Sequence, residues 1–279
     1  MTLALVAARA EELAAVLRIG AWRPWKTRGR SAWRRRRSPD GTLAYQRRDH
    51  TVSAILTGAG KNQTERGMDW LLNAEKPESI LSVGFSGACS PNLDIGDLVL
   101  STSTQYLGGK PFDWEPGSLN TGNDEEKYLG TTRDISADRK LLEKTRDTVE
   151  IAGIDFMTAP TLTVDSLVRT AGLSAWLGET YGIAAVDRES YWVAAAASNA
   201  GIPCLIVRAI TYGVNDTLPG LAAKFPDTPS GGRFGPVFRH SLKHPGEVWR
   251  FRKSLRSARN SVANLAGVLA INGNLTTTV

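Results

Sequence analysis

Three charged residues, Asp187, Arg188 and Glu189, stand where an apolar segment meets an alanine-rich one. The apolar segment 183–186 is typical of a buried strand, and the segment 189–199 is typical of a helix. A carboxylate at the carboxyl end of a strand can bind the hydroxyl groups of a ligand. The same carboxylates also have a purely structural interpretation, because Asp187 can cap the helix and Glu189 can favour its dipole. Both interpretations stay open on the sequence alone.

A second polar group ends the next apolar segment along the chain. The run CLIVRAI at 204–210 is followed by Thr211 and Tyr212, and then by Asn215 and Asp216. In an α/β protein, ligands bind where the carboxyl ends of neighbouring strands meet at one edge of the sheet. We therefore expect this second group to converge with the first.

Three short motifs approach known catalytic or binding patterns, and each lacks a required residue. The stretch GAGK at 58–61 has neither the first glycine nor the Ser or Thr of a phosphate-binding loop. The stretch GFSGA at 84–88 lacks the last glycine of a nucleophile elbow, and Pro91 argues against the helix that should follow. His240 and His244 lack the intervening glutamate of a zinc motif, so no metal site is predicted. What remains is a Gly/Ser loop at 84–88, whose N–H groups can bind an anion or a sugar hydroxyl.

The elements that must position these groups alternate between strand and helix. Strands are predicted at 3–7, 51–57, 79–83, 97–104, 156–164, 183–186 and 204–211. Helices are predicted around 11–17 and at 63–73, 135–152, 173–182, 189–199 and 247–270. The strands are nearly all apolar, as expected when helices cover both faces of a mixed or parallel sheet. We predict a single α/β domain over residues 1–279, with a long loop over a site between 108 and 130.

Composition sets limits on the class of protein. The chain has 279 residues, 42% of them hydrophobic, with two cysteines and a formal charge of +6. That length can bury one substantial core, whereas two cysteines cannot form a disulfide scaffold. Neither a secretion leader nor an apolar run of roughly 20 residues is visible. The prediction is a cytoplasmic protein that does not cross a membrane.

The positive charge is concentrated in two clusters. Seven Lys or Arg residues and no acid lie between Lys26 and Arg37, and a second cluster runs from Arg239 to Arg259. The second overlaps the predicted helix 247–270, whose apolar stripe and basic back are typical both of a helix packed on a core and of one lying on an anionic membrane. Each cluster is thus either a solvated face or a membrane contact. Nucleic acid is not expected as a partner, because no DNA- or RNA-binding signature accompanies the arginines.

Four segments, which span most of the chain, carry a family resemblance. They are LVAARAEEL at 5–13, TGAGKNQ at 57–63, SVGFSGACSPNLDIGDLVLS at 82–101, and 184–219. In this order they resemble the nucleoside phosphorylase and nucleosidase superfamily, which includes purine nucleoside phosphorylase and methylthioadenosine nucleosidase. The resemblance implies a three-layer α/β/α fold with a central mixed sheet, and cleavage of the N-glycosidic bond of an adenine-type nucleoside. It also implies phosphate or water as the nucleophile, no cofactor, and a homodimer or larger homo-oligomer.

One branch of that superfamily is the closest in appearance. The segment NDTLP at 215–219 and the basic C-terminal helix resemble the hopanoid-associated phosphorylases. That likeness implies a nucleoside with a lipid-like 5′ substituent. It also implies peripheral contact with the inner face of an anionic membrane.

The resemblance assigns roles residue by residue. Glu189 matches the glutamate that holds the ribose hydroxyls, and Glu12 matches the carboxylate that positions the attacking water. Arg188 stands where a methionine packs under the sugar, and an arginine can instead bind phosphate. The catalytic residues predicted are Glu12 and Asp216. The substrate-binding residues predicted are Phe85, Ser86, Gly87, Leu167, Val168, Arg188, Glu189, Thr211 and Tyr212.

The largest departure from the family pattern is Tyr212. It stands where an aspartate protonates the base as the glycosidic bond breaks, and a tyrosine, with a reference pKa near 10, is a far weaker acid. Asp216 lies close enough in sequence to be a candidate replacement. Ser82 likewise stands where phosphorylases carry a phosphate-binding arginine. Two classes of function therefore stay open: an active enzyme, and a catalytically impaired member that binds a nucleoside.

Overall fold

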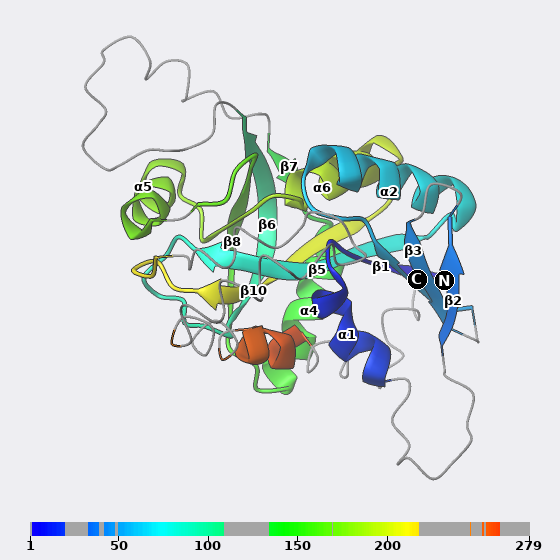
Figure 1. The fold of residues 1–279 in the computed structure, drawn as a ribbon, viewed down its shortest axis with the longest axis horizontal. Coiled ribbons are helices and arrows are strands. Elements are labelled where there is room, and N and C mark those ends of the chain that lie inside the picture. The colour runs from blue at the N-terminus through cyan, green and yellow to red at the C-terminus, as the bar shows by residue number, and fades with distance from the viewer. Residues whose placement is uncertain are drawn as a thin grey trace.

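The computed structural model gives the arrangement of most of the chain (Figure 1). It describes residues 2–19, 33–38, 42–47, 50–108, 134–168, 170–217, 246, 253 and 255–262. Three predicted features lie largely or wholly outside these ranges: the loop 108–130, the histidine pair His240 and His244, and most of the basic segment 239–252.

A ten-stranded mixed sheet forms the centre of the molecule. Its parallel core consists of β1 (Leu3–Ala7), β4 (Val52–Leu56), β5 (Ser79–Ala88) and β10 (Cys204–Tyr212). Beyond β10 lie β6 (Leu98–Leu107), β7 (Ile135–Ser136), β8 (Phe156–Val164) and β9 (Ala185–Asp187). Because β10 pairs with both β5 and β6, and β9 pairs with both β8 and β5, the strands β10, β6, β8, β9 and β5 close into a ring.

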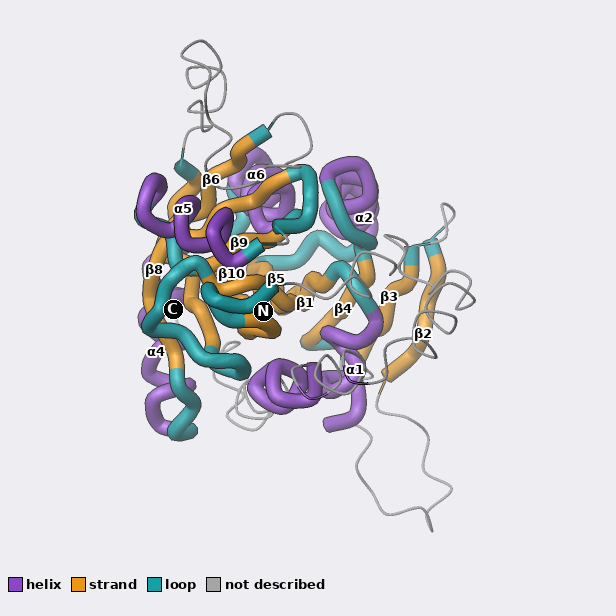
Figure 2. Tube along the Cα trace, turned by 60° about the vertical axis from the view of Figure 1, so that its left-hand side comes forward, coloured by secondary structure: helices purple, strands orange, loops and turns teal. Residues whose placement is uncertain are grey.

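Helices cover both faces of the sheet (Figures 1 and 2). One face buries Leu13 of α1 (Ala10–Ile19) and Val149 of α4 (Arg139–Ile151) in a shared apolar cluster. The other face buries Met68 of α2 (Lys61–Ala74) and Val193 of α6 (Ser190–Asn199). A further helix, α5 (Ala171–Tyr181), packs against β8 through Leu173, Leu177 and Leu162. The predicted three-layer α/β/α fold is confirmed.

The predicted helix 135–152 is wrong at its start. Residues 135–136 form β7 against β6, and the helix α4 begins only at Arg139. The reason is local, because the Asp138 carboxylate accepts a hydrogen bond of 2.8 Å from the Leu141 N–H. A side-chain acceptor of this kind satisfies a free N–H of the first turn and defines the helix start.

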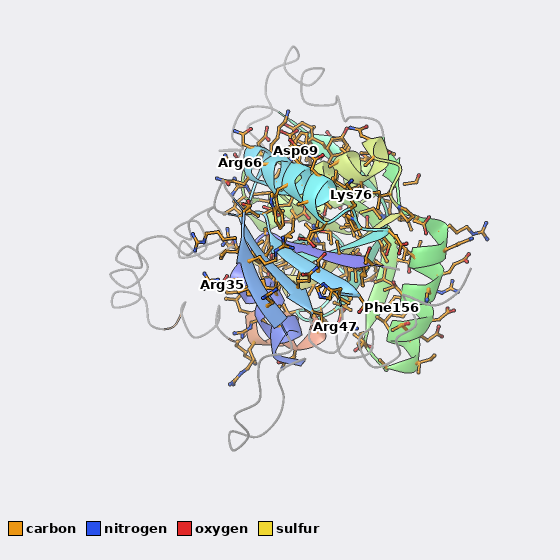
Figure 3. All side chains as sticks on the ribbon, turned by 90° about the vertical axis from the view of Figure 1, so that its right-hand side faces the viewer. Arg35, Arg47, Arg66, Asp69, Lys76 and Phe156 are labelled. Atoms are coloured by element: carbon orange, nitrogen blue, oxygen red, sulfur yellow. The ribbon has the colours of Figure 1, made fainter. Side chains whose placement is uncertain are left out.

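The arginine run forms an edge strand that periodicity did not predict. Strand β2 (Trp33–Arg37) pairs with β3 (Leu43–Arg47), which pairs with β4, so β2 ends this side of the sheet. Arg34 to Arg37 are all exposed, and Arg36 forms an ion pair of 2.5 Å with Glu75 of α2. Figure 3, which looks onto this edge, shows Arg35 and Arg47 there. Charged side chains on an edge strand oppose pairing with another chain.

The described part of the basic C-terminal segment is helical over 255–262. Ala258 and Val262 are buried in the same apolar cluster as α1 and α4, and the Ser257 hydroxyl donates to the Ile95 carbonyl at 3.2 Å. Arg256 is exposed. In this part of the chain the apolar stripe packs on the core. No helix among the described residues is long and apolar enough to cross a membrane.

Candidate active site

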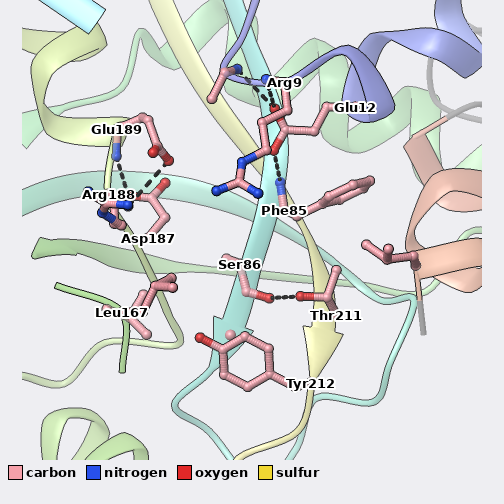
Figure 4. A pocket seen from close by; sticks show the side chains of 14 residues that line it. Arg9, Glu12, Phe85, Ser86, Leu167, Asp187, Arg188, Glu189, Thr211 and Tyr212 are labelled. Atoms are coloured by element: carbon pink, nitrogen blue, oxygen red, sulfur yellow. Dashed lines mark hydrogen bonds between the residues drawn. The ribbon is translucent and has the colours of Figure 1, made fainter. Parts of the chain in front are cut away.

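A cavity of about 120 Å³ lies where β5, β9 and β10 end (Figure 4). It is lined by every predicted site residue except Val168 and Asp216. Leu255, from the helical segment 255–262, completes one side. Of the second polar group, Thr211 and Tyr212 converge with the first group at this pocket, whereas Asn215 and Asp216 do not line it. Residues 84–88, predicted as a Gly/Ser loop, instead continue strand β5, because they pair with β10 and β9.

Glu12 is held by three backbone groups at one end of this pocket. Its carboxylate accepts from the N–H groups of Ala8, Arg9 and Phe85 at 2.9, 2.8 and 3.0 Å. The residue is 5% exposed, and this burial raises the pKa of its carboxyl, while the hydrogen bonds and the charge of Arg208 act in the opposite direction. A carboxylate fixed this way can orient a nucleophile and accept its proton.

Arg208 is a buried arginine, 3% exposed, for which the sequence predicted no role. Its Nε lies 2.5 Å from Asp187 Oδ2, and its Nη atoms donate to the carbonyl and hydroxyl of Ser82 at 3.1–3.2 Å. A Cβ on Gly84 would lie 3.3 Å from both Arg208 Nη1 and Glu12 Oε1, so glycine leaves room for these two groups to approach each other over the strand. The available signal was one charged residue in the otherwise apolar run CLIVRAI.

Asp187 takes the structural role that the sequence allowed. Its Oδ1 accepts from the N–H of Ser190 at 3.1 Å, from the N–H of Glu189 at 3.2 Å and from the Thr163 hydroxyl at 2.8 Å. Its Oδ2 accepts from the Ser190 hydroxyl and from Arg208. The carboxylate therefore caps the start of α6 and also holds the buried guanidinium in place.

Glu189 connects the starts of two helices. Its Oε1 accepts from the Gly60 N–H at 3.1 Å, at the start of α2, where Gly60 has a φ of +81° that favours glycine. Burial raises the pKa of Glu189 to about 7, and the negative charges of Asp187 and Glu12 add to the effect. Arg208 and Arg188 oppose it. This carboxyl therefore titrates near neutral pH.

The raised pKa of Glu189 predicts a pH dependence of stability. Between the unfolded value of 4.5 and about 7, the folded protein holds a proton on Glu189 that the unfolded chain has released. The free energy of unfolding therefore falls as pH rises through this window, and Glu12 contributes in the same direction. Urea denaturation at pH 5 and pH 7.5 measures this fall. Glu189→Gln should make it smaller, and an unchanged fall would contradict the assignment.

Arg188 lies beside the pocket entrance near two backbone segments. Its Nε donates to the Asp165 carbonyl at 3.2 Å, and its Nη2 lies 3.3 Å from the position that a Cβ on Gly60 would take. The guanidinium is partly exposed. Its predicted role toward phosphate stays a prediction.

Tyr212 closes the end of the pocket opposite Glu12. Its ring lies so close to Gly87 that a Cβ there would be 2.2 Å away, so this position requires glycine. Its hydroxyl lies 3.5 Å from the Val168 carbonyl, and burial raises the pKa of the phenol. Val168 itself turns its side chain into the cluster below α5. Tyr212 is therefore a neutral aromatic wall at this end of the pocket.

Asp216 is not brought into the pocket. Its carboxylate accepts from the Gly213 N–H at 2.8 Å, and the residue is exposed. This contact closes a turn after β10. The part of the chain that the structure describes also contains no group of three or more His, Cys, Asp or Glu residues that could hold a metal ion.

Comparison with known proteins agrees with the fold. A family model described as the phosphorylase superfamily matches residues 2–227. A 5′-methylthioadenosine/S-adenosylhomocysteine nucleosidase from an Exiguobacterium species is 25% identical over 57% of this chain and 66% of its own length. One from Glaesserella parasuis is 24% identical over 57% of this chain and 67% of its own length. The chain thus matches only about two thirds of each relative.

Solved structures are similar over nearly the whole chain. The Neisseria meningitidis nucleosidase of the same name, in complex with methylthio-immucillin-A, superimposes with a TM-score of 0.69 at 15% identity, covering 97% of this chain and 99% of that one. The futalosine hydrolase of Helicobacter pylori gives a TM-score of 0.65 at 14% identity, covering 95% and 97%. Since the family model covers most of the chain, the chain belongs to the phosphorylase superfamily.

Proposed function

We propose that this protein is an enzyme that cleaves the N-glycosidic bond of an adenine-type nucleoside, with water as the nucleophile. The observation that carries the proposal is the pair of carboxylates Glu12, which is buried, and Glu189, which is partly buried. They come from α1 and from the start of α6, line one pocket, and lie near enough for the charge of Glu12 to raise the pKa of Glu189. Both curated relatives are nucleosidases, which agrees with this activity.

The geometry supports a division of labour between the two carboxylates. Glu189 accepts hydrogen bonds from the ribose hydroxyls, in place of part of its present contact with the Gly60 N–H. Glu12 orients a water molecule and accepts its proton as the oxygen adds to the anomeric carbon. The bond from that carbon to the base nitrogen breaks, and its electron pair stays with the base. The base takes up a proton from solvent, and Glu12 returns to solvent the proton that it accepted. The products are the ribose derivative and the free base.

The charges around the pocket favour water over phosphate. Three carboxylates, those of Glu12, Asp187 and Glu189, line it beside two arginines, Arg9 and Arg188, so a phosphate dianion would meet more negative than positive lining side chains. Arg208 is already bound to Asp187 and Ser82 through Nε and both Nη atoms. Arg9 and Arg188 are the candidates for phosphate among the described lining residues. Dependence on phosphate would point to a phosphorylase.

A second candidate function is binding without turnover. The observation that favours it is Tyr212, a neutral and partly buried phenol at the end of the pocket opposite Glu12. An aromatic wall can hold a planar base without donating a proton to it. Adenosine that binds the protein and stays intact would identify this function.

The test is adenine release from adenosine, methylthioadenosine and a long-chain 5′-alkyl analogue, with and without phosphate. We expect release without phosphate. Glu12→Gln should lower it by at least about 100-fold, because general base catalysis contributes roughly 10²- to 10⁴-fold. Circular dichroism controls for folding of the variant. Binding without release would leave only the second candidate.

We further propose an apolar, lipid-like 5′ substituent, as in the hopanoid-associated branch. Leu255 and Phe85 lie on one side of the pocket and offer apolar contact to such a group. Arg34 to Arg37 on the edge strand, with Arg256 on the C-terminal helix, offer exposed positive charge to an anionic membrane. Each basic residue near such a surface contributes about 1 kcal/mol. Peripheral attachment to the inner membrane face from the cytoplasm, and a homodimer or larger oligomer, remain predictions.

Liposome sedimentation tests the membrane contact. We expect binding to vesicles containing phosphatidylglycerol and little binding to pure phosphatidylcholine. Replacing Arg34 to Arg37 by alanine should release the protein. As a matched control, the four basic residues Arg139, Lys140, Lys144 and Arg146 of α4 are replaced instead, which should leave binding in place. Equal binding to both lipids would refute the proposal.

A further inference from the structure

Ser86 has a buried hydroxyl without a partner, and it lies in the wall of the pocket. The residue is 4% exposed, and its Oγ has no hydrogen-bond partner in the described structure. Figure 4 shows Ser86 near the middle of the ring of lining side chains. A buried hydroxyl without a hydrogen bond destabilises a folded protein, so its presence calls for a physical reason.

The backbone on either side holds Ser86 in place. The N–H of the preceding Phe85 is bound to Glu12, and the ring of Tyr212 covers the following Gly87. The pairing of β10 with β5 shifts register between Ile210 and Tyr212, and the hydroxyl of Thr211 donates to the Ser86 carbonyl at 3.0 Å. The extra residue in this shift is Thr211 of β10, and its hydroxyl fixes the backbone of Ser86 on the neighbouring strand. The hydroxyl of Ser86 is therefore positioned in advance of ligand binding.

Three other buried hydroxyls in the described residues lack a partner, and they differ from Ser86 in location. They belong to Thr64 of α2, Thr104 of β6 and Thr145 of α4. None of these residues lines the pocket. Within this set, Ser86 is the residue whose unpaired hydroxyl belongs to the wall of this pocket.

We propose that Ser86 Oγ forms a hydrogen bond with the nucleobase and is a specificity-determining residue of this site. The proposal rests on the proposed function. In the proposed function, Glu12 and Glu189 bind the sugar and the attacking water. Ser86 is followed on β5 by Gly87, on which the ring of Tyr212 lies, so Ser86 is on the side of the pocket where the base would bind. That wall and Leu167 suit the faces of a planar ring. A hydroxyl both donates and accepts, so it can pair with a ring nitrogen or an exocyclic amine.

This assignment predicts effects of opposite sign on stability and on binding. Ser86→Ala removes the unpaired group, so the melting temperature of the free protein should rise by roughly 2 °C. The same change removes one hydrogen bond to the base. Calorimetry, carried out for adenosine in a Glu12→Gln background that slows its cleavage, should show Kd values for adenine and for adenosine that are each about 10-fold weaker. If Ser86 had only a structural role, Ser86→Ala would not raise the melting temperature and weaken binding at the same time.

Thr145→Val is the matched control, because it also removes an unpaired buried hydroxyl. It should raise the melting temperature and leave both Kd values unchanged. The proposal is overturned if Ser86→Ala lowers the melting temperature of the free protein, leaves adenine binding intact, or weakens adenosine alone, which would place the contact on the sugar. If the wild type binds neither adenine nor adenosine, the proposed function fails and this proposal fails with it.

Discussion

Replacing Tyr212 by aspartate is expected to raise the rate of adenine release by roughly 10²- to 10⁴-fold, the usual contribution of a general acid. Departure of the base leaves an electron pair on a ring nitrogen, and a nearby acid lowers the barrier by protonating it. Tyr212 is a poor donor here, because burial raises the pKa of a phenol that is already a weak acid. A carboxyl group at the same position supplies a proton more readily.

Two variants separate proton donation from the change in size. Tyr212→Asn matches aspartate in volume and has no acidic proton, so it should not show the gain. Tyr212→Phe keeps the ring over Gly87 and removes only the hydroxyl. All three should be compared at equal folded fraction, because the smaller residues lose the aromatic packing on Gly87. If Tyr212→Phe lost most of the wild-type rate, the phenol itself would be the donor and the expectation would be wrong.

Replacing Arg208 by methionine is expected to lower the free energy of unfolding by about 3–5 kcal/mol. Arg208 and Asp187 form an ion pair whose side chains are only 3% and 2% exposed. Loss of the guanidinium leaves Asp187 as a buried carboxylate without its cation, close to Glu189 and Glu12. Urea denaturation followed by circular dichroism measures the change.

Two further variants test whether the loss of stability in Arg208→Met comes from the burial and pairing of its charge. The double change Arg208→Met with Asp187→Asn removes the isolated charge and should recover part of the lost stability. The ion pair of Arg36 with Glu75 has a similar N–O distance of 2.5 Å, but the arginine side chain is 44% exposed. Arg36→Ala should therefore cost at most about 1 kcal/mol. An equal cost for Arg36→Ala and Arg208→Met would contradict the argument.

Much of the fold could be predicted from the sequence, because most of its elements have regular periodicity. The apolar run at 156–164 is β8 over the same residues, and the alanine-rich segment after Asp187 is α6. The edge strands β2 and β3 were not predicted. Strand β2 is exposed at the edge of the sheet, and four of its residues are arginines, so it lacks the alternation of apolar and polar residues that predicts a strand. It is held in the sheet by its pairing with β3.

Some residues of the candidate site could likewise be predicted from the sequence, and others could not. Residue types at strand ends, together with the family resemblance, pointed to Glu12, Glu189 and Tyr212 before any geometry was known. Arg208 received no role, because nothing local shows that its partner is Asp187, twenty-one residues earlier in the chain. Asp216 was a reasonable candidate by sequence distance, but its carboxylate closes a local turn instead.

Apart from β2, β3 and β7, the sequence by itself determined the order of strands and helices, the family, and the kinds of polar groups at the strand ends. Only the tertiary structure decided that Glu12, Ser86, Glu189 and Tyr212 share one pocket, and that the ring of Tyr212 lies on Gly87. It also decided that the pKa of Glu189 is near 7. The physical reason is that pairing, burial and electrostatic interaction depend on distances in space between residues far apart in the chain, whereas periodicity and capping depend on neighbours.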